Sequence, residues 1–404
     1  MNKRVVIVGG GAAGFFAAIT CAEQNRGVQI TILEKTAKVL EKVRISGGGR
    51  CNVTHACFDP RELTRNYPRG ERELIGPYHS FQAEDTVRWF EERGVRLKKE
   101  ADGRMFPVTD SSQTIIDCLL REAKQKGVQV RPNCGVNSVS KKGDEFQLHL
   151  STGESVTSER LLLATGGCRT PGLGQIPVSL GHTLVPPVPS LFTFHIEAPW
   201  VRELAGVTIP EVELSVPETK LKSTGPLLFT HWGISGPAVL RLSAWGARTL
   251  HEKGYSFPLR VSWSPANSVN LSAHAQANAA KQVLNSALPP LPSRIWAALV
   301  NLAGLPRERR WSAVSRAEHQ RLFQTLSATT LPVTGKSLNK DEFVTCGGVA
   351  LDEVNFKTME SKICPGLYFA GELLDIDGLT GGFNFQAAWT TGWIAGNKMA
   401  AQGD

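Results

Sequence analysis

The sequence has 404 residues, a formal net charge of +8 at pH 7 and 41% hydrophobic residues. That composition excludes a disordered or fibrous protein, and the length suffices for two or three domains. No apolar run approaches the roughly 20 residues of a membrane-spanning helix, so we expect no integral membrane protein. The charge is uneven, because residues 341–404 hold three lysines, no arginine and nine acids, which leaves +14 on the first 340 residues. This excess suits a polyanionic partner such as nucleic acid, or is simply a basic surface.

The start of the chain predicts a βαβ unit. Apolar residues 4–8 and 28–33 are typical of buried parallel strands, and residues 12–25 predict the helix between them. A basic start before an apolar stretch also resembles a secretory leader, but three consecutive glycines at 9–11 fit a strand-to-helix turn better. The eight cysteines are scattered, with no CxxC pair and no Cys/His cluster, which predicts reduced thiols, a cytoplasmic location and no metal site.

The turn after the first strand carries a dinucleotide-binding fingerprint. Gly9, Gly11 and Gly14 form the GxGxxG pattern, with Ala12 and Ala13 inside it. The three glycines allow a tight turn, the approach of a pyrophosphate and close packing of the helix on the strand. The N-terminus of the helix offers free N–H groups to the phosphates. We therefore predict that these five residues contact the cofactor.

The second strand and the C-terminal segment identify the cofactor. Glu34 lies 20 residues after Gly14 and can accept hydrogen bonds from an adenosine ribose, which FAD and NAD share. The C-terminal segment favours FAD, because its acids could bind ribityl hydroxyls and the N-terminus of its closing helix, residues 383–400, could stabilise the negative charge of reduced flavin. The predicted contacts in that segment are Gly371, Glu372, Asp377, Gly382, Phe383 and Asn384.

The middle of the chain has a different composition. Residues 171–237 contain many prolines and short alternating segments, which favours an antiparallel β domain, and residues 270–328 have helical spacing of apolar residues. We therefore predict an α/β protein, with a Rossmann-like FAD-binding domain built from both chain ends around an inserted antiparallel β domain and a small helical subdomain. The predicted boundaries are 1–188 and 341–404 for the FAD domain, 189–269 for the β domain, 270–330 for the helical subdomain and 331–340 for a return linker.

Five further motifs resemble one family of flavoproteins, the YhiN/BaiN-like NAD(P)/FAD-dependent oxidoreductases. The most specific are Ser-Gly-Gly-Gly-Arg-Cys-Asn within residues 42–54 and Gly-Gly-Phe-Asn within residues 371–386. The others are the alanine-threonine-glycine-glycine stretch at 164–167, Phe-Thr-His-Trp-Gly-Ile-Ser-Gly-Pro at 229–237 and Thr-Cys-Gly-Gly-Val at 345–349. The resemblance covers essentially the whole chain. It departs after residue 167, where a Thr-Gly-x-Gly segment of many members is missing, which suggests a sub-branch with a different substrate.

The resemblance implies FAD held by the two ends of the chain, with the β and helical inserts over the flavin. The activities attached to the family include reduction of carbon–carbon double bonds in small molecules, amine oxidation, and reduction of a ribosomal RNA uridine to dihydrouridine. Membership thus implies the cofactor more firmly than the substrate.

The glycine-rich loop after Glu34 is expected to reach the pyrophosphate or the edge of the flavin. Its arginines could pair with phosphates or polarise the flavin, although a solvent-facing loop would have the same composition. The further predicted cofactor contacts are Lys35, Arg44, Ser46, Gly47, Gly48, Arg50, Cys51, Asn52, Thr165 and Gly166.

Three residues are candidates for the catalytic chemistry. Cys51 could donate a proton next to the carbon that accepts a hydride, although a cysteine is commonly just a small buried apolar residue. His231 could contact substrate or donate a proton, and a structural histidine is an equal alternative. Cys346 could lie near the flavin. A redox disulfide between Cys51 and Cys57 is disfavoured, because five residues separate them and the triple glycine does not suit a helix.

A basic stretch at 294–321 is a candidate RNA surface. It holds six arginines, two glutamates and two tryptophans, and arginine with aromatic rings is a typical combination for holding single-stranded RNA. A solvated helical face with core tryptophans has the same composition. The predicted contacts are Arg294, Arg307, Arg309, Arg310 and Trp311.

The sequence therefore predicts an FAD-dependent oxidoreductase that reduces an unsaturated ring or C=C bond, with NAD(P)H as the electron donor. The leading substrate is a uridine of ribosomal RNA, which would have to be exposed or flipped to reach a buried flavin. The alternatives are a small-molecule enone reductase or amine oxidase, and a flavin-bearing RNA-binding or assembly factor. The sequence leaves the oligomeric state open.

Overall fold

The computed structural model describes residues 3–168, 171–263, 270–337 and 344–401. The chain divides into two compact units, Met1–Pro189 with Asp341–Asp404, and Ser190–Lys340. The departure from the family pattern after residue 167 begins at residues 169–170, which lie outside the described part. None of the described helices is both long enough and apolar enough to cross a bilayer.

The first unit is built on a seven-stranded sheet of order β19-β20-β21-β10-β1-β2-β6, of which five strands are parallel. Four of these five are short and largely apolar because neighbouring elements bury them, whereas β6, at the edge of the sheet, is Gln-Val-Arg and stays exposed or half-buried. The strands of the sheet are β1 (Arg4–Val8), β2 (Gln29–Leu33), β6 (Gln129–Arg131), β10 (Arg160–Leu163), β19 (Val354–Asn355), β20 (Glu360–Ser361) and β21 (Leu367–Phe369).

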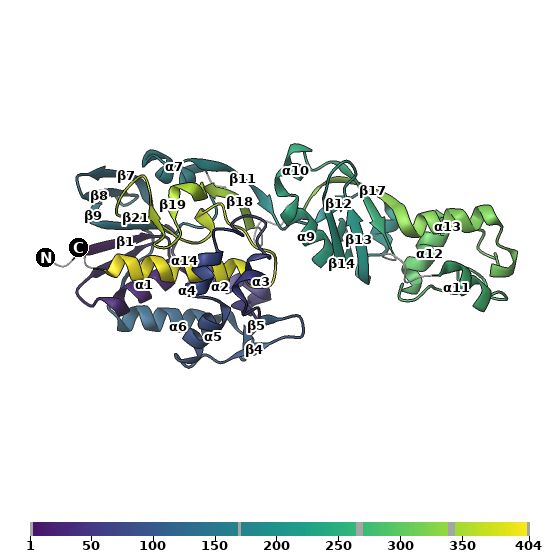
Figure 1. The fold of residues 1–404 in the computed structure, drawn as a ribbon, viewed down its shortest axis with the longest axis horizontal. Coiled ribbons are helices and arrows are strands. Elements are labelled where there is room, and N and C mark those ends of the chain that lie inside the picture. The colour runs from purple at the N-terminus through teal and green to yellow at the C-terminus, as the bar shows by residue number, and fades with distance from the viewer. Residues whose placement is uncertain (1–2, 169–170, 264–269, 338–343, 402–404) are drawn as a thin grey trace. The chain divides into compact units, whose positions relative to one another are not determined.

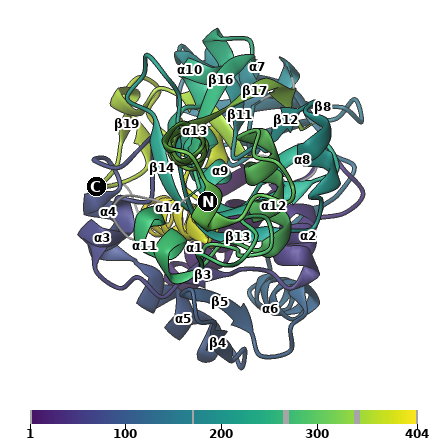
Figure 2. The ribbon, with the colours of Figure 1, turned by 90° about the vertical axis from the view of Figure 1, so that its right-hand side faces the viewer.

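Two helices from opposite ends of the chain lie side by side in this unit, α1 (Ala12–Gln24) and α14 (Phe383–Ala400), as Figures 1 and 2 show. Glycines on α14 permit this approach, since a Cβ at Gly392 would lie 2.6 Å from the carbonyl oxygen of Ala13 and one at Gly396 would lie 2.5 Å from that of Ala17. The packing brings the N-terminus of each helix to the same end of the unit, so the predicted assembly of the domain from both chain ends is confirmed.

Smaller elements complete the first unit. A three-stranded sheet, β3-β5-β4, contacts α5 and α6 (Figures 1 and 2), β7, β8 and β9 form a meander, and β11 pairs with β18. The strands are β3 (Thr54–His55), β4 (Leu97–Lys99), β5 (Arg104–Pro107), β7 (Val136–Lys142), β8 (Glu145–Leu150), β9 (Ser155–Ser158), β11 (Leu184–Ser190) and β18 (Val344–Val349). The helices are α2 (Glu41–Gly49), α3 (Pro60–Thr64), α4 (Ile75–Ser80), α5 (Ala83–Glu91), α6 (Ser112–Gln125), α7 (Pro171–Ser179), η2 (Leu351–Glu353) and η3 (Gly371–Leu373).

A buried histidine joins three segments of the first unit. The His182 ring places Nδ1 3.0 Å from Glu353 Oε2 and Nε2 2.8 Å from Ser361 Oγ. The Ser361 hydroxyl also accepts hydrogen bonds from two backbone amides, so its proton is free to point at the ring. Because the carboxylate can only accept, the neutral ring donates from Nδ1 and accepts at Nε2.

Acid should weaken this link. Burial lowers the pKa of His182 below its ordinary 6.5, so the unfolded chain takes up the proton first. The contribution of His182 to stability is therefore complete above pH 6.5 and is lost as the pH falls below it. We expect the thermal unfolding midpoint to fall between about pH 7 and pH 5, and to fall less in a His182→Gln variant. Exposed His149→Gln is the control, and equal pH profiles for His182→Gln and the wild type would contradict the assignment.

The second unit is a closed antiparallel barrel of order β12-β15-β14-β13-β16-β17 with helices attached. Its strands are β12 (Phe194–Ile196), β13 (Thr208–Ser215), β14 (Lys222–Thr230), β15 (Gly233–Ser235), β16 (Phe257–Ser262) and β17 (Thr329–Lys336). The helices are α8 (Pro199–Glu203), α9 (Pro237–Trp245), α10 (Ala247–Glu252), α11 (Leu271–Ala277), α12 (Ser293–Leu302), η1 (Trp311–Ala313) and α13 (Arg316–Ala328). The predicted α/β class, with an antiparallel β insert and helices, is confirmed.

One predicted segment differs in this unit. Residues 331–336, expected in a return linker, belong to β17, which pairs with both β12 and β16 and closes the barrel. The alternation of apolar Leu331 and Val333 with Thr330 and Pro332 is typical of a barrel strand. Residues 338–340 of the expected linker lie outside the described part of the chain.

Candidate functional site

The fingerprint turn forms an opening at the carboxyl end of β1. A Cβ at Gly9 would lie 2.3 Å from the carbonyl oxygen of Ala164, and one at Gly14 would lie 2.0 Å from that of Gly9, so packing requires both glycines. A Cβ at Gly11 would meet no atom within 4 Å. Gly11 also caps α1 without a side-chain hydrogen bond, so no capping side chain takes up the first-turn amides of Ala12 and Ala13. The opening therefore suits a pyrophosphate.

Glu34 lies beside this turn, where the sequence predicts the adenosine ribose. Its Oε2 accepts a hydrogen bond from the Gly10 N–H at 2.9 Å, and its Oε1 accepts from the N–H and hydroxyl of Thr36 at 2.9 Å. These bonds fix the carboxylate at the end of β2, and it remains half-exposed. Lys35 next to it is exposed and packs its Cβ toward Gly135.

The glycine-rich loop at the end of α2 leaves the helical conformation. Ser46 turns to an extended ψ of 149°, its hydroxyl donates to the Val43 carbonyl, and Gly47 and Gly48 follow with φ of 56° and 67°. Gly47 packs against Phe106 and Asn52, whereas a Cβ at Gly48 or Gly49 would meet no atom within 4 Å. Three successive left-handed residues thus expose backbone beside open space, as the predicted cofactor contact requires.

The two arginines of this segment are engaged elsewhere. Arg50 pairs with Glu100 at 2.6 Å and lies over the ring of Phe106, so it fastens the loop to the β3-β5-β4 sheet. Arg44 donates to Gln113 on α6 at 2.7 Å and lies 3.3 Å from Glu41. Protein acceptors bind both guanidinium groups in this structure, and their predicted pairing with cofactor phosphates stays a prediction.

Cys51 and Asn52 are both buried. The Cys51 thiol has no exposed surface, and burial raises its pKa to about 12. A thiol covered by protein atoms cannot reach a substrate in this structure, so burial argues against the predicted proton donor. With its carboxamide oriented to satisfy its neighbours, Asn52 accepts from the Gly382 N–H at 3.0 Å and donates to the Thr54 carbonyl. Asn52 thus links the loop to the start of α14.

The carboxyl ends of β10 and β21 meet beside the fingerprint. Thr165 has a buried hydroxyl without a hydrogen-bond partner in the described structure, which suits an acceptor on a bound cofactor. Gly166 has a φ of 76° and Gly371 a φ of 73°. Glu372 accepts from the Thr345 N–H at 3.0 Å and forms an ion pair with Lys42, which the sequence did not single out for a contact.

The N-terminus of α14 is held by side chains from distant segments. Gly382 caps the helix in a left-handed conformation without a side-chain hydrogen bond, so the first-turn amides are open. The buried Tyr67 hydroxyl donates to the Phe383 carbonyl at 2.5 Å. Asn384 pairs through its carboxamide with the N–H and carbonyl of Gly378 at 2.8 and 2.9 Å. The positive end of the helix dipole is therefore fixed in place, as the prediction of a flavin-facing terminus requires.

Asp377 differs from its predicted role. Its side chain has no exposed surface and forms an ion pair with Arg69, which is itself largely buried. Asp377 therefore fixes the segment around Arg69 to the loop before α14, and burial prevents the expected contact with ribityl hydroxyls. No local pattern reveals this pair, because 308 residues separate its members.

A further residue at this site was missed. His55 stacks on the Phe383 ring with centroids 4.8 Å apart, and its ring lies 3.4 Å from a Cβ built at Gly381. Nε2 lies 3.1 Å from the Asp102 carbonyl, whereas Nδ1 is buried without a partner in the described residues. The signal was its position directly after the Ser-Gly-Gly-Gly-Arg-Cys-Asn-Val-Thr stretch.

The remaining candidates for catalysis differ in exposure. His231 is exposed on the turn between β14 and β15, next to the exposed ring of Trp232. Cys346 lies on β18 with no exposed surface, so burial argues against contact with a substrate. None of the eight cysteines, which all lie in the described part of the chain, forms a disulfide. Among the described residues no group of three or more His, Cys, Asp or Glu side chains could hold a metal ion.

The structure divides the predicted RNA contacts into exposed and engaged residues. Arg307 and Arg310 are exposed. Arg309 pairs with Glu318 at 2.9 Å, and Arg294 donates to the Glu203 carbonyl. Trp311 is buried, and its Nε1 donates to the Ser286 hydroxyl at 2.6 Å. Its ring packs beside Trp296 in the core of the helical subdomain, so the prediction that it stacks on a base is wrong for this structure.

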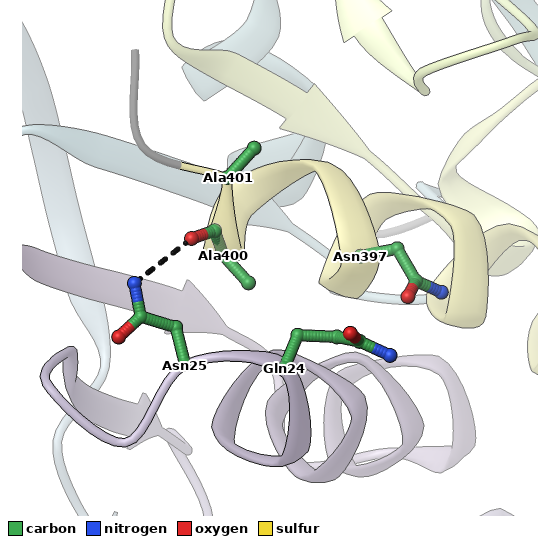
Figure 3. Close-up of a pocket in the computed structure, with 5 residues that line it drawn as sticks. All are labelled: Gln24, Asn25, Asn397, Ala400 and Ala401. Carbon is green, nitrogen blue, oxygen red and sulfur yellow. Dashed lines mark hydrogen bonds between the residues drawn. The ribbon is translucent and has the colours of Figure 1, made fainter.

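A surface depression of about 480 Å³ lies at the C-terminal ends of α1 and α14 (Figure 3). It is lined by Gln24, Asn25, Asn397, Ala400 and Ala401, and Asn25 donates to the Ala400 carbonyl at 3.1 Å. Because cofactor phosphates bind at helix N-termini, this depression at the C-termini is separate from the predicted site.

The chain is similar to proteins of known activity over its whole length. It is 30% identical to the ribosomal RNA dihydrouridine synthase of Escherichia coli, covering 98% of each chain. It is 28% identical to the 3-dehydro-bile acid delta(4,6)-reductase of Clostridium scindens, covering 98% of this chain and 99% of that protein. In fold it resembles the 3-ketosteroid-delta4-(5alpha)-dehydrogenase of Rhodococcus jostii, with a TM-score of 0.54, 14% identity, and coverage of 99% and 98% of the two chains.

The fold and the site define an FAD-dependent oxidoreductase with a Rossmann-type cofactor domain. The open space at Gly11, the unpartnered Thr165 hydroxyl and the two free helix N-termini fit the phosphate and flavin ends of FAD. The family model described as "HI0933-like protein Rossmann domain" matches residues 3–398, and the chain belongs to this family. The predicted family, enzyme class and cofactor are therefore confirmed.

Proposed function

We propose that this protein reduces a uridine of ribosomal RNA to dihydrouridine, with NAD(P)H as the electron donor. Relatives named ribosomal RNA dihydrouridine synthase, from Escherichia coli and Haemophilus influenzae, are 30% and 27% identical and match 98% of this chain. The bile acid reductase is 28% identical, so identity alone does not separate the two substrate classes. Both names describe reduction of carbon–carbon double bonds, which supports that chemistry here.

The charge of the helical subdomain favours RNA over a small molecule, and this observation carries the proposal. Residues 270–328 hold seven lysines and arginines against two glutamates and no aspartate, a net charge of +5. A small apolar substrate gives no reason for such an excess, whereas RNA phosphates are attracted by it. The substrate would be cytoplasmic, which agrees with the expected location.

The residues of the cofactor domain support this chemistry. When bound, FAD supplies a hydride to the substrate. The first turn of α1 at Gly11 would hold the pyrophosphate, Glu34 the ribose, and the N-terminus of α14 would stabilise negative charge on the ring. A proton must also reach the neighbouring carbon. Cys51 and Cys346 are buried, so exposed His231 is the remaining candidate for that proton or for a substrate contact.

The test is a deletion strain of the source organism, analysed by mass spectrometry of nucleosides from purified ribosomal RNA. We expect dihydrouridine to be lost on deletion and restored by the wild-type protein, but not by a Gly11→Val variant that cannot hold FAD. Unchanged dihydrouridine after deletion would refute this substrate and favour a small-molecule reductase or oxidase. Restoration of a growth or assembly defect by Gly11→Val would favour the non-enzymatic assembly factor.

A further inference from the structure

In the helical subdomain, backbone hydrogen bonds pair two segments that carry exposed basic residues. Segments 279–283 and 309–312 run side by side, because the Val283 N–H donates to the Arg309 carbonyl at 2.8 Å and the Trp311 N–H donates to the Lys281 carbonyl at 3.1 Å. An antiparallel bridge between Gln282 and Arg310 belongs to the same contact. This pairing brings Lys281, which is distant in sequence, next to the arginine-rich segment.

The start of α13 adds to this region. Its first residue is Arg316, and a capping box between Ser315 and Glu318 fixes the helix N-terminus. The buried Glu318 carboxylate also pairs with Arg309 at 2.9 Å, and hydrogen bonds from Ser315 lower its pKa despite its burial. Glu318 is therefore occupied by groups inside the subdomain and is not directed to the exposed cations.

The four exposed cations form a surface that we call the basic tip, made of Lys281, Arg307, Arg310 and Arg316. In the described part of the chain none of the four has an ion pair or a side-chain hydrogen bond. One exposed acid, Glu308, lies in the same region, where Gln282 Nε2 is 3.5 Å from its Oε2. Unpaired guanidinium and ammonium groups of this density are typical of surfaces that bind phosphates.

A depression of about 360 Å³ lies within this region and is lined by Pro306, Glu308, Arg309, Arg310, Ser312 and Ala313. The side chains of Arg309 and Arg310 line it, so the depression carries positive charge that suits a phosphate.

We propose that the basic tip binds the phosphates of the RNA substrate. This inference rests on the proposed function and names the surface that holds the partner. Because Trp296 and Trp311 are both buried, neither ring is available to stack on bases, and we expect binding at the tip to be mainly electrostatic. The tip thus holds the RNA chain, and recognition of the uridine belongs to another part of the protein.

The experiment measures binding of a fluorescein-labelled single-stranded 20-nucleotide RNA to the full-length FAD-loaded protein, by fluorescence anisotropy over a range of KCl concentrations. The variant is Arg307→Glu with Arg310→Glu. We expect affinity at about 0.1 M salt to fall at least roughly tenfold, and the slope of log affinity against log salt to decrease by about 0.7 for each phosphate that the variant no longer neutralises. Arg307→Lys with Arg310→Lys should retain most of the binding and of the slope.

The matched control is Arg26→Glu with Lys253→Glu, which changes the net charge equally at exposed sites outside the tip. It should bind nearly as well as the wild type. If the control variant loses RNA affinity equally, the effect comes from overall charge and the inference is wrong. Unchanged RNA affinity of the tip variant would also overturn the inference, and an acidic protein would then be the next partner to test for the basic tip. If the tip variant loses binding while deletion leaves ribosomal dihydrouridine unchanged, the proposed function fails and the RNA surface stands.

Discussion

A Gly11→Val variant is expected to fold normally and to lose FAD. Because a Cβ at this position would meet no protein atom within 4 Å, and because the backbone there has φ −94° and ψ −168°, which L-residues adopt readily, valine should not disturb the protein. Its side chain would instead occupy the space that the pyrophosphate needs. We expect the purified variant to be colourless, with FAD affinity reduced by more than roughly 100-fold, or about 2.7 kcal/mol. Absorbance at the flavin band and titration with FAD measure this.

Gly14→Val is the matched control. A Cβ at Gly14 would lie 2.0 Å from the Gly9 carbonyl oxygen, so this variant should destabilise or misfold the domain rather than specifically release the cofactor. Circular dichroism and the unfolding midpoint should therefore separate the two variants. A Gly11→Val protein that retains stoichiometric FAD would place the phosphates elsewhere and would contradict the site.

Arg69→Met is expected to destabilise the first unit strongly. It would leave the Asp377 carboxylate, which has no exposed surface, without its guanidinium partner. Removing one member of a buried ion pair costs about 3–5 kcal/mol, because a buried charge remains uncompensated. We expect a decrease of this size in the free energy of unfolding, measured by urea titration with tryptophan fluorescence, together with weaker FAD binding because Asp377 fixes the loop before α14.

Two further variants test the physical reason. Arg69→Met with Asp377→Asn removes both charges and should recover a large part of the stability. Arg65→Met removes an exposed arginine that pairs with Glu62, and its cost should be below about 1 kcal/mol. A double variant as unstable as Arg69→Met would show that packing, and not the unpaired charge, accounts for the decrease.

In the arginine-rich stretch at 294–321, composition alone did not distinguish an RNA-binding surface from a solvated helical face with core tryptophans. The sequence predicted both a basic surface and a stacking ring, since two tryptophans lie among the six arginines there. The tertiary structure buries Trp311 between core residues and pairs Arg309 with Glu318. It also adds Lys281 from a segment about 30 residues earlier, through backbone pairing that no local pattern encodes.

The sequence by itself determined the class of cofactor, because the features that bind a pyrophosphate lie within a few consecutive residues. They are a turn that needs Gly9 and Gly14, open space at Gly11 and the N-terminus of a helix. It also determined that both chain ends build one domain, since an FAD site needs the glycine turn before α14. Only the tertiary structure decided which charges face the site. Asp377 pairs with Arg69 and Arg50 with Glu100, because the partner of a buried or half-buried charge is set by packing between distant segments, and spacing along the chain carries no record of it.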